Sequence, residues 1–128
     1  MKEIIAIIRM NKMGQTKKAL INAGFPSFTA HKVMGRGKGF VDLDLLRGAA
    51  EGLEDAIPQL AHGPRLIPKR ILKMVVPDDK VELLVETVIK VNQTHHAGDG
   101  RIFVMPIIDA IRIRTKESGL EAINEMNE

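Results

Sequence analysis

Apolar residues follow two different periods along this chain, and the periods predict strands and helices in turn. Residues Lys2–Arg9 are rich in β-branched side chains and predict a buried strand. Asn11 suits a helix N-cap, and the helix that follows is predicted to end at Gly24. Thr29–Met34 predicts a second strand. The buried face of the helix is predicted to comprise Met13, Thr16, Leu20 and Ala23.

The second half of the chain shows the same alternation. Arg70–Val76 predicts a third strand, and Pro77 then opens a second helix. Asp79 and Glu82 have the spacing of a capping box in this helix. Its buried face is predicted to comprise Val81, Leu84, Val85 and Val88. The remaining predicted elements are a fourth strand at Arg101–Ile108, a short strand at Ile111–Ile113 and a helix near Glu117–Asn127.

The region between the second and third strands has no clean period. Its first residues, Gly35–Gly39, are basic and rich in glycine, which predicts a flexible junction, and residues 40–68 combine glycine and proline with many leucines. A short helix near Ala49–Leu60 fits part of this pattern. A long segment without firm structure in a small domain usually has a function, and this one is too apolar for a linker. We interpret it as a loop that docks on another protein.

The order of these elements predicts the fold class. The chain reads β-α-β-loop-β-α-β, which is the ferredoxin-like arrangement of an α/β (α+β) sandwich. Two helices would cover one face of the sheet, yet several strands are apolar on both faces, as at Ile4–Ile8 and Ile107-Ile108. We therefore expect the second face to be covered by oligomerisation.

The composition narrows the classes of protein that fit. The 128 residues suit one domain, residues 1–128, and 45% of them are apolar. Cysteine is absent, which excludes disulfides and thiolate metal sites and agrees with a cytoplasmic protein. The run Ile4–Ile8 is too short to span a membrane. A net charge of +3 and only four phenylalanines argue against a nucleic-acid domain.

The polar residues show no catalytic or metal-binding pattern. His95 and His96 are adjacent, so they point apart in an extended segment, and His31 and His62 are distant in sequence. No nucleophile motif is present, and Asp78-Asp79 is better explained as a helix cap. We assign no catalytic residue and no metal ligand.

Three stretches carry candidate binding chemistry. The turn Gly98-Asp99-Gly100 lets backbone amides converge on an anion, with Arg101 suited to phosphate, although such turns are also common without a ligand. Arg112 and Arg114 alternate with isoleucines, so they would share one face of a strand, as a polyphosphate site or as a solvated edge. The junction Gly35–Gly39 would either approach a ligand or act as a hinge.

Together these stretches resemble the PII signal-transduction family over nearly the whole chain. The matching stretches are Lys2–Arg9 (first strand), Arg47-Gly48-Ala49 (T-loop), Val75–Asp79 (strand-to-helix turn), Thr94–Phe103 (B-loop) and Ile111–Thr115 (C-loop). The resemblance implies a trimer with ATP or ADP between subunits, a T-loop at about 37–69, a B-loop at about 94–101 and a C-terminal segment at 109–128. The implied nucleotide-binding residues are Thr29, Gly35, Gly37, Lys38, Gly98, Asp99, Gly100, Arg101, Arg112 and Arg114.

The resemblance also implies an effector and a partner. Lys69 would pair with a carboxylate of 2-oxoglutarate, and Gly39 stands where the family has the glutamine that holds Mg²⁺ and 2-oxoglutarate. The T-loop would regulate a nitrogen-metabolism protein, nitrogenase above all, from a homotrimer or a mixed oligomer with a paralogue. The resemblance also implies a role in the transcriptional control of nitrogen metabolism.

Several positions depart from the family pattern. The T-loop is longer than in common bacterial members, and its modifiable tyrosine has no counterpart because the chain contains no Tyr. Arg101 replaces the B-loop lysine, and Lys73 replaces an acidic residue near the adenine. The longer loop without Tyr resembles the nitrogenase-associated branch found in archaea and some anaerobic bacteria.

Two other functions fit the same residues. A slow ATP-hydrolysing enzyme would show turnover of ATP. A trimeric interaction module without effector control would show no response to nucleotide in a titration.

Overall fold

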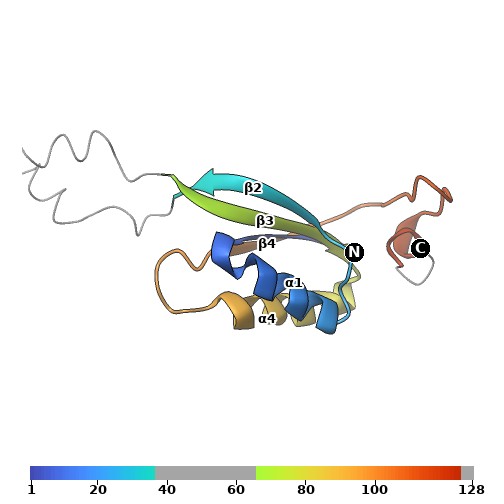
Figure 1. Ribbon diagram of the computed structural model, residues 1–128. Coiled ribbons are helices and arrows are strands. Elements are labelled where there is room, and N and C mark those ends of the chain that lie inside the picture. Colours follow the sequence, from blue (N-terminus) through green and yellow to red (C-terminus); the bar gives the residue numbers. More distant parts are fainter. Residues whose placement is uncertain (37–65, 125–128) are drawn as a thin grey trace, which may run out of the picture.

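The structure, a computed structural model, describes residues 1–36 and 66–124. The helix predicted near Ala49–Leu60 lies outside this range. Figure 1 shows the elements in sequence colours. They are β1 (Lys2–Arg9), the 3₁₀ helix η1 (Met10–Lys12), α1 (Met13–Asn22), β2 (Thr29–Gly35), β3 (Ile67–Val76), η3 (Asp78–Lys80), α4 (Val81–Asn92), β4 (Arg101–Pro106) and η4 (Gly119–Ile123).

The strands form one four-stranded sheet in the order β2-β3-β1-β4, in which neighbouring strands are antiparallel. The central strand β1 pairs Ile4 with Met74 of β3 on one side and with Val104 of β4 on the other. Helices α1 and α4 lie side by side on the same face (Figure 1). The predicted ferredoxin-like fold is confirmed. The third strand begins at Ile67, three residues before the predicted start at Arg70.

The core lies between the sheet and the two helices. Alternate residues of β1 point into it, and Leu20 of α1 and Leu84 of α4 are fully buried there. The Asn92 amide joins the helices, because its Nδ2 donates to the Thr16 hydroxyl at 3.0 Å and to the Val88 carbonyl at 2.9 Å. The buried hydrophobic residues are Ile4, Ala6, Ile8, Leu20, Phe25, Leu72, Met74, Val76, Leu84 and Val88.

The two ends of α1 are capped in different ways. Asn11 does not cap α1 as predicted, because Asn11 lies within the turn η1, which precedes the helix. Lys12 occupies the N-cap position and makes no side-chain cap hydrogen bond. The other end matches the prediction. Gly24 takes a φ of 96°, its amide donates to Ile21 at 3.1 Å, and the Phe25 amide reaches the Leu20 carbonyl at 2.8 Å. This Schellman geometry turns the chain and buries Phe25.

The start of α4 also differs from the predicted capping box. The turn η3 precedes the helix, Lys80 occupies its cap position, and no side-chain cap hydrogen bond forms at either element. The neighbouring Asp78 has a different role. Its carboxylate lies 3.0 Å from the Met1 ammonium and 2.9 Å from Lys2 Nζ, so it fastens the turn to the beginning of β1.

The face of the sheet opposite α1 and α4 is partly apolar, and the described residues of one chain leave much of it open. The alternation that buries Ile4 and Ile8 sends Ile5 and Ile7 to this face, where they are half-buried. Phe103 of β4 pairs with Ile5 there and remains 43% exposed. The apolar pattern on both sides of the strands therefore reflects two real faces, of which the helices cover one.

The chain after β4 forms a separate feature, which we call the C-terminal arm (residues 107–124). The fourth strand ends at Pro106 and not at Ile108, because its partner β1 begins at Lys2, directly opposite Pro106. The predicted strand Ile111–Ile113 is reduced to one bridge between Ile111 and Ser118. In place of the predicted helix at Glu117–Asn127, the described residues contain only the short η4.

The arm extends away from the helices (Figure 1). Several of its large apolar side chains are exposed: Ile108 is 102% and Ile113 95% exposed relative to an extended chain, whereas Ile107 and Ile123 are half-buried. In residues 1–36 and 66–124, no helix has the length and apolar character needed to cross a membrane.

Candidate functional site

The B-loop (residues 94–101) joins α4 to β4 and is held by one carboxylate. Asp99 Oδ2 accepts hydrogen bonds from the Thr94 amide at 2.7 Å and the His95 amide at 2.9 Å. Asp99 Oδ1 accepts from the Thr94 hydroxyl. The acid is thus turned back into its own loop, and its side chain is 24% exposed. The first and last parts of the loop are tied together at this point.

Arg9 fastens the B-loop to the sheet. It is the last residue of β1, and its Nη1 lies 2.6 Å from Asp99 Oδ1. Its Nη2 donates to the Ala97 carbonyl at 3.0 Å, so the guanidinium grips both a side chain and the backbone of the loop. A planar guanidinium is suited to such a two-point contact.

Lys69 supports the loop from β3. The ladder places Lys69 directly opposite Arg9, and its side chain is buried, with 7% of the residue exposed. Its Nζ donates to the Gly98 carbonyl at 2.9 Å. Burial lowers the pKa of Lys69, the nearby Arg9 lowers it further, and the Asp99 charge opposes both effects.

Backbone conformation and close packing explain why the loop has glycine at two positions. Gly98 and Gly100 take φ values of 98° and 108°, in the left-handed region that favours glycine. A Cβ atom at Gly100 would lie 1.9 Å from the Ile7 carbonyl oxygen of β1. The loop therefore touches the sheet backbone directly at this position, and only glycine fits. His95 also has a positive φ, of 65°. The hydrogen bond from its backbone amide to the Asp99 carboxylate helps to hold this conformation.

The surroundings of the loop favour an anion. Arg9, Lys69 and Arg101 bring three cationic side chains to this end of the sheet, and the Asp99 carboxylate is occupied by its own loop. Among the described residues, no group of three or more His, Cys, Asp or Glu side chains gathers in a way that could hold a metal ion. Backbone amides and cationic side chains are the groups that the described part of this site could offer to a ligand.

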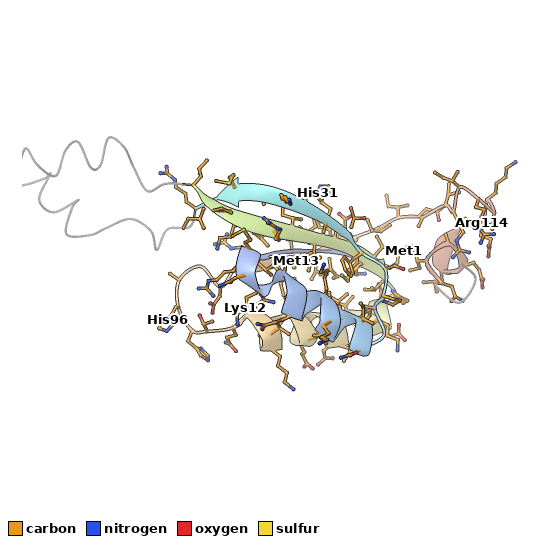
Figure 2. The ribbon with its side chains drawn as sticks, in the orientation of Figure 1. Met1, Lys12, Met13, His31, His96 and Arg114 are labelled. Atoms are coloured by element: carbon orange, nitrogen blue, oxygen red, sulfur yellow. The ribbon has the colours of Figure 1, made fainter. Side chains whose placement is uncertain are left out.

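The arginines of the C-terminal arm do not reach the B-loop in the same chain. The Ile107 amide donates to the Met1 carbonyl at 3.1 Å, so the arm leaves beside the start of β1, whereas the B-loop lies at its end. Figure 2 shows Arg114 and His96 at opposite ends of the molecule.

The two arm arginines also differ from each other in their surroundings. Arg112 is half-buried: its Nη1 lies 3.1 Å from Glu117 Oε1, and its Nη2 donates to the Asn124 carbonyl at 2.7 Å. Arg114 is exposed. They do not share one face of a strand as predicted, because the strand is not formed there.

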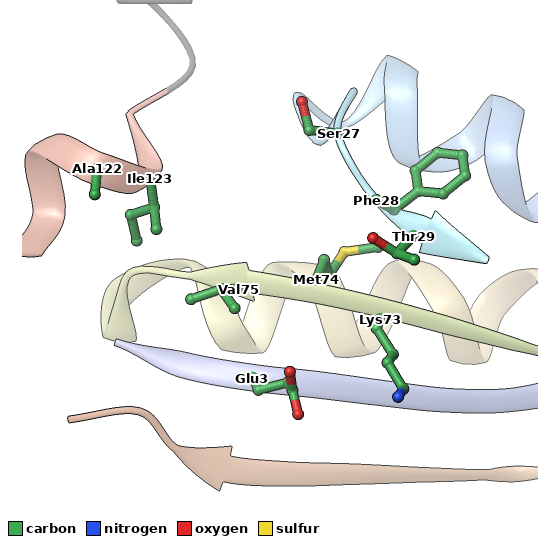
Figure 3. A pocket seen from close by; sticks show the side chains of 9 residues that line it. All are labelled: Glu3, Ser27, Phe28, Thr29, Lys73, Met74, Val75, Ala122 and Ile123. Atoms are coloured by element: carbon green, nitrogen blue, oxygen red, sulfur yellow. The ribbon is translucent and has the colours of Figure 1, made fainter. Parts of the chain in front are cut away.

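The other predicted residues are spread along β2. Thr29 begins the strand and pairs with Lys73, and Gly35 ends it opposite Ile67. Gly37, Lys38 and Gly39 lie outside the described residues. Thr29 and Lys73 line a cavity of about 400 Å³ together with Glu3 and with Ile123 of η4 (Figure 3). One chain thus brings Lys69 to the B-loop, whereas Thr29, Arg112 and Arg114 lie elsewhere.

Sequence reasoning missed the roles of Arg9 and Thr94. Both lie within stretches that the sequence singled out, but neither was given a contact. One signal was available for Arg9, since a cation ending an apolar strand needs a counter-charge once the sheet brings Lys69 beside it. No pattern in the sequence identifies the inward turn of Asp99.

Comparison with known proteins gives consistent matches. The family model for "Nitrogen regulatory protein P-II" matches residues 1–117. The chain is 48% identical over 123 residues to a "Nitrogen fixation nifHD region GlnB-like protein 2" of Methanobacterium ivanovii, with 96% of this chain and 99% of the relative covered. A protein of the same description from Methanococcus maripaludis is 48% identical over 126 residues, covering 96% and 100%.

A third relative carries the general family name. "Nitrogen regulatory protein P-II 2" of Methanothermobacter thermautotrophicus is 38% identical over 123 residues, covering 96% of this chain and 97% of the relative. The family predicted from the sequence is confirmed by these matches, and the nifHD-region names agree with the predicted nitrogenase-associated branch.

The close approach of Gly100 to β1 predicts a strong effect of substitution. Gly100→Ala should lower the free energy of unfolding by about 2 kcal/mol or more, because the methyl group meets backbone at a positive φ. Gly14→Ala in α1 is the control, where a Cβ meets nothing within 4 Å and should stabilise by about 0.5 kcal/mol. Equal urea denaturation curves for the two variants would contradict this account.

The hydrogen bonds to Asp99 predict an unusual titration. The Thr94 hydroxyl and amide, with Arg9 and the His95 amide, hold the pKa of Asp99 well below its usual range. A lowered pKa means that the carboxylate stabilises the loop above pH of about 4 and that this contribution is lost only as pH falls through the lowered value. In an NMR titration, the Asp99 carboxyl carbon should show no midpoint near pH 4, and Thr94→Val should move the midpoint upward. An ordinary midpoint in the unchanged protein would refute the prediction.

Proposed function

Because the chain belongs to the family of nitrogen regulatory protein P-II, we propose that it is a nitrogen-status sensor. It binds ATP or ADP together with 2-oxoglutarate and regulates a partner protein through the loop at residues 37–69. The observation that carries the proposal is the B-loop itself, a glycine turn with cations on its sheet side and a buried lysine beneath it.

The B-loop fits the phosphates of a nucleotide. Positive φ angles at Gly98 and Gly100 let the backbone turn tightly here, and a concave run of amides is a common anion site. Arg101 begins β4 at the edge of the loop and is exposed, so its guanidinium is available to a phosphate oxygen. The Asp99 carboxylate would repel phosphate if it faced outward, and its inward bonds avoid this conflict.

A trimer would complete the site. The arm of one chain lies at the opposite end from its own B-loop, so the arm arginines of a neighbouring copy would have to approach the loop. The partly apolar open face, with Ile5 and Phe103, supplies a reason for copies to associate. Arg114 and, after release from Glu117, Arg112 would then contact the phosphates. Thr29 and Lys73 would lie on the adenine side.

Lys69 is proposed to read the effector. Its ammonium group is already beside the B-loop backbone, and a carboxylate of 2-oxoglutarate would give it an opposite charge in place of a neutral carbonyl. Bound ATP would bring Mg²⁺, and at Gly39 the chain has no side-chain oxygen for the metal. The remaining oxygen ligands would come from the nucleotide, the effector and water.

The energies require both ligands to act on the loop at 37–69. Moving a two-state loop from mostly docked to mostly withdrawn takes about 5 kcal/mol of differential affinity. A hydrogen bond to a charged group contributes roughly 1.5–3 kcal/mol. Lys69 alone is therefore insufficient, and ATP must also favour one loop state. The proposed partner is nitrogenase, which the relatives named for the nifHD region of nitrogen fixation support.

The proposed assembly predicts a mass three times that of the 14.2 kDa chain in sedimentation equilibrium. Phe103→Asp should dissociate it, because a charge would be buried at the open face. The neighbouring Val104→Asp is the control, since Val104 points to the other face and is 46% exposed. A stable monomer of the unchanged protein at micromolar concentration would contradict the shared site.

The effector mechanism predicts mutual tightening of ATP and 2-oxoglutarate by the same factor, measured in calorimetric titrations of each ligand with and without the other. Lys69→Ala should retain ATP binding and lose the response of ATP affinity to 2-oxoglutarate. Lys90→Ala on the outer surface of α4 is the control and should keep that response.

Two results would redirect the proposal. If the affinity for ATP is the same with and without saturating 2-oxoglutarate, this chain does not read the effector, and a paralogue in a mixed oligomer would have to do so. If ATP does not bind at all, the chain is an interaction module without nucleotide control.

A further inference from the structure

Arg9 contacts the B-loop itself, which distinguishes it from an arginine that is free to bind phosphate. In the structure its guanidinium is engaged with the loop: Nη1 meets Asp99 Oδ1 at 2.6 Å and Nη2 meets the Ala97 carbonyl at 3.0 Å. Its side chain is 25% exposed, compared with the exposed Arg101 at the other side of the loop. An arginine held in this way contributes through what it positions.

We propose that Arg9 is a positioning residue that builds the B-loop before any ligand arrives, so that it sets nucleotide affinity without contacting the nucleotide. This inference rests on the proposed function, since it takes the B-loop as the phosphate site. Asp99 transmits the effect. The strand-bound cation fixes the carboxylate, and the carboxylate fixes the amides of Thr94 and His95.

The position of Arg9 in the sheet explains why it can act as a strut. It is the last residue of β1, and its backbone is paired with Lys69 of β3, while β4 pairs with β1 only as far as Ile7. The B-loop contributes little packing of its own, because His95, His96 and Ala97 are exposed. A loop with little packing depends on its polar contacts for order.

Charge makes the arrangement specific. Arg9 and Lys69 face each other across the ladder, and like charges in that position repel. Asp99 lies beside both, and its charge opposes the lowering of the Lys69 pKa. A neutral residue at 99 would therefore leave two neighbouring cations and a loop without its anchor. Occupancy of the ordered loop, and with it ligand affinity, would fall by the same factor.

The first measurement is amide hydrogen exchange by NMR without nucleotide. In Arg9→Ala, the Thr94 and His95 amides should exchange at least about tenfold faster, because the bonds that protect them weaken. Lys2→Ala is the matched control. It removes a cation from the other end of β1 that pairs with Asp78 at 2.9 Å, and it should leave these two amides unchanged.

The second measurement is ATP affinity by calorimetry on the assembled protein. Arg9→Ala should weaken ATP binding roughly 10-fold to 100-fold, and Lys2→Ala by no more than about twofold. Arg9→Lys should be intermediate, because one ammonium group can reach Asp99 or the Ala97 carbonyl but does not reproduce the fork. Added ATP should restore more protection at Thr94 and His95 in Arg9→Ala than in the unchanged protein.

A double-mutant cycle separates positioning from direct contact. If Arg9 acts through Asp99, Arg9→Ala should cost little further affinity in an Asp99→Asn background. If Arg9 touches the nucleotide, it should weaken binding equally in both backgrounds, and this result would overturn the proposal. Unchanged exchange at Thr94 and His95 in Arg9→Ala would also overturn it. Failure of the proposed function would give a different result, because the unchanged protein would bind no ATP. Faster amide exchange in Arg9→Ala would in that case still support the role of Arg9 in ordering the B-loop.

Discussion

Two helices can cover only one face of a four-stranded sheet, and this constraint determines how the rest of the molecule is arranged. The residues of β1 that point toward α1 and α4 are buried, while Ile5 and Ile7 on the other face are only half-buried. The fold therefore leaves an apolar surface beside the two features that carry candidate chemistry, the B-loop and the C-terminal arm. Both features extend from the ends of the sheet, where the helices do not constrain them.

The B-loop shows how an acidic residue can belong to the proposed anion site. A carboxylate near phosphate is unfavourable unless its charge is compensated. Here the compensation is internal: two amides, a hydroxyl and the Arg9 guanidinium surround Asp99. The opposite charges of Asp99 and Arg9 compensate each other, so Lys69 and Arg101 leave this end of the sheet positively charged. The loop is shaped by electrostatics where other loops are shaped by packing.

The sequence predicted the sheet and both main helices because their apolar periods agree with their final burial. Leu20, Leu84 and Val88 lie in the core as the helical spacing indicated. Helix starts were predicted less well, since short 3₁₀ turns at Met10 and Asp78 replaced the expected side-chain caps. Such turns depend on contacts with distant residues, as between Asp78 and Lys2, which no local pattern records.

The candidate site was predicted by residue type better than by geometry. The glycines and cations of the B-loop were recognisable, and Lys69 does lie against the loop. The arm was predicted as strand and helix because Arg112 and Arg114 alternate with isoleucines. Within the described residues, the pairing of this segment is limited to the bridge between Ile111 and Ser118, and both isoleucines remain exposed, so alternation alone did not produce a strand.

The separation of the B-loop from the arm has a genetic consequence in the proposed trimer. Each copy would give its loop to one site and its arm to another. A copy damaged in both features would impair two sites, so its effect would exceed its share of the assembly and would be dominant. Copies damaged in different features would complement each other, because an intact loop could still meet an intact arm.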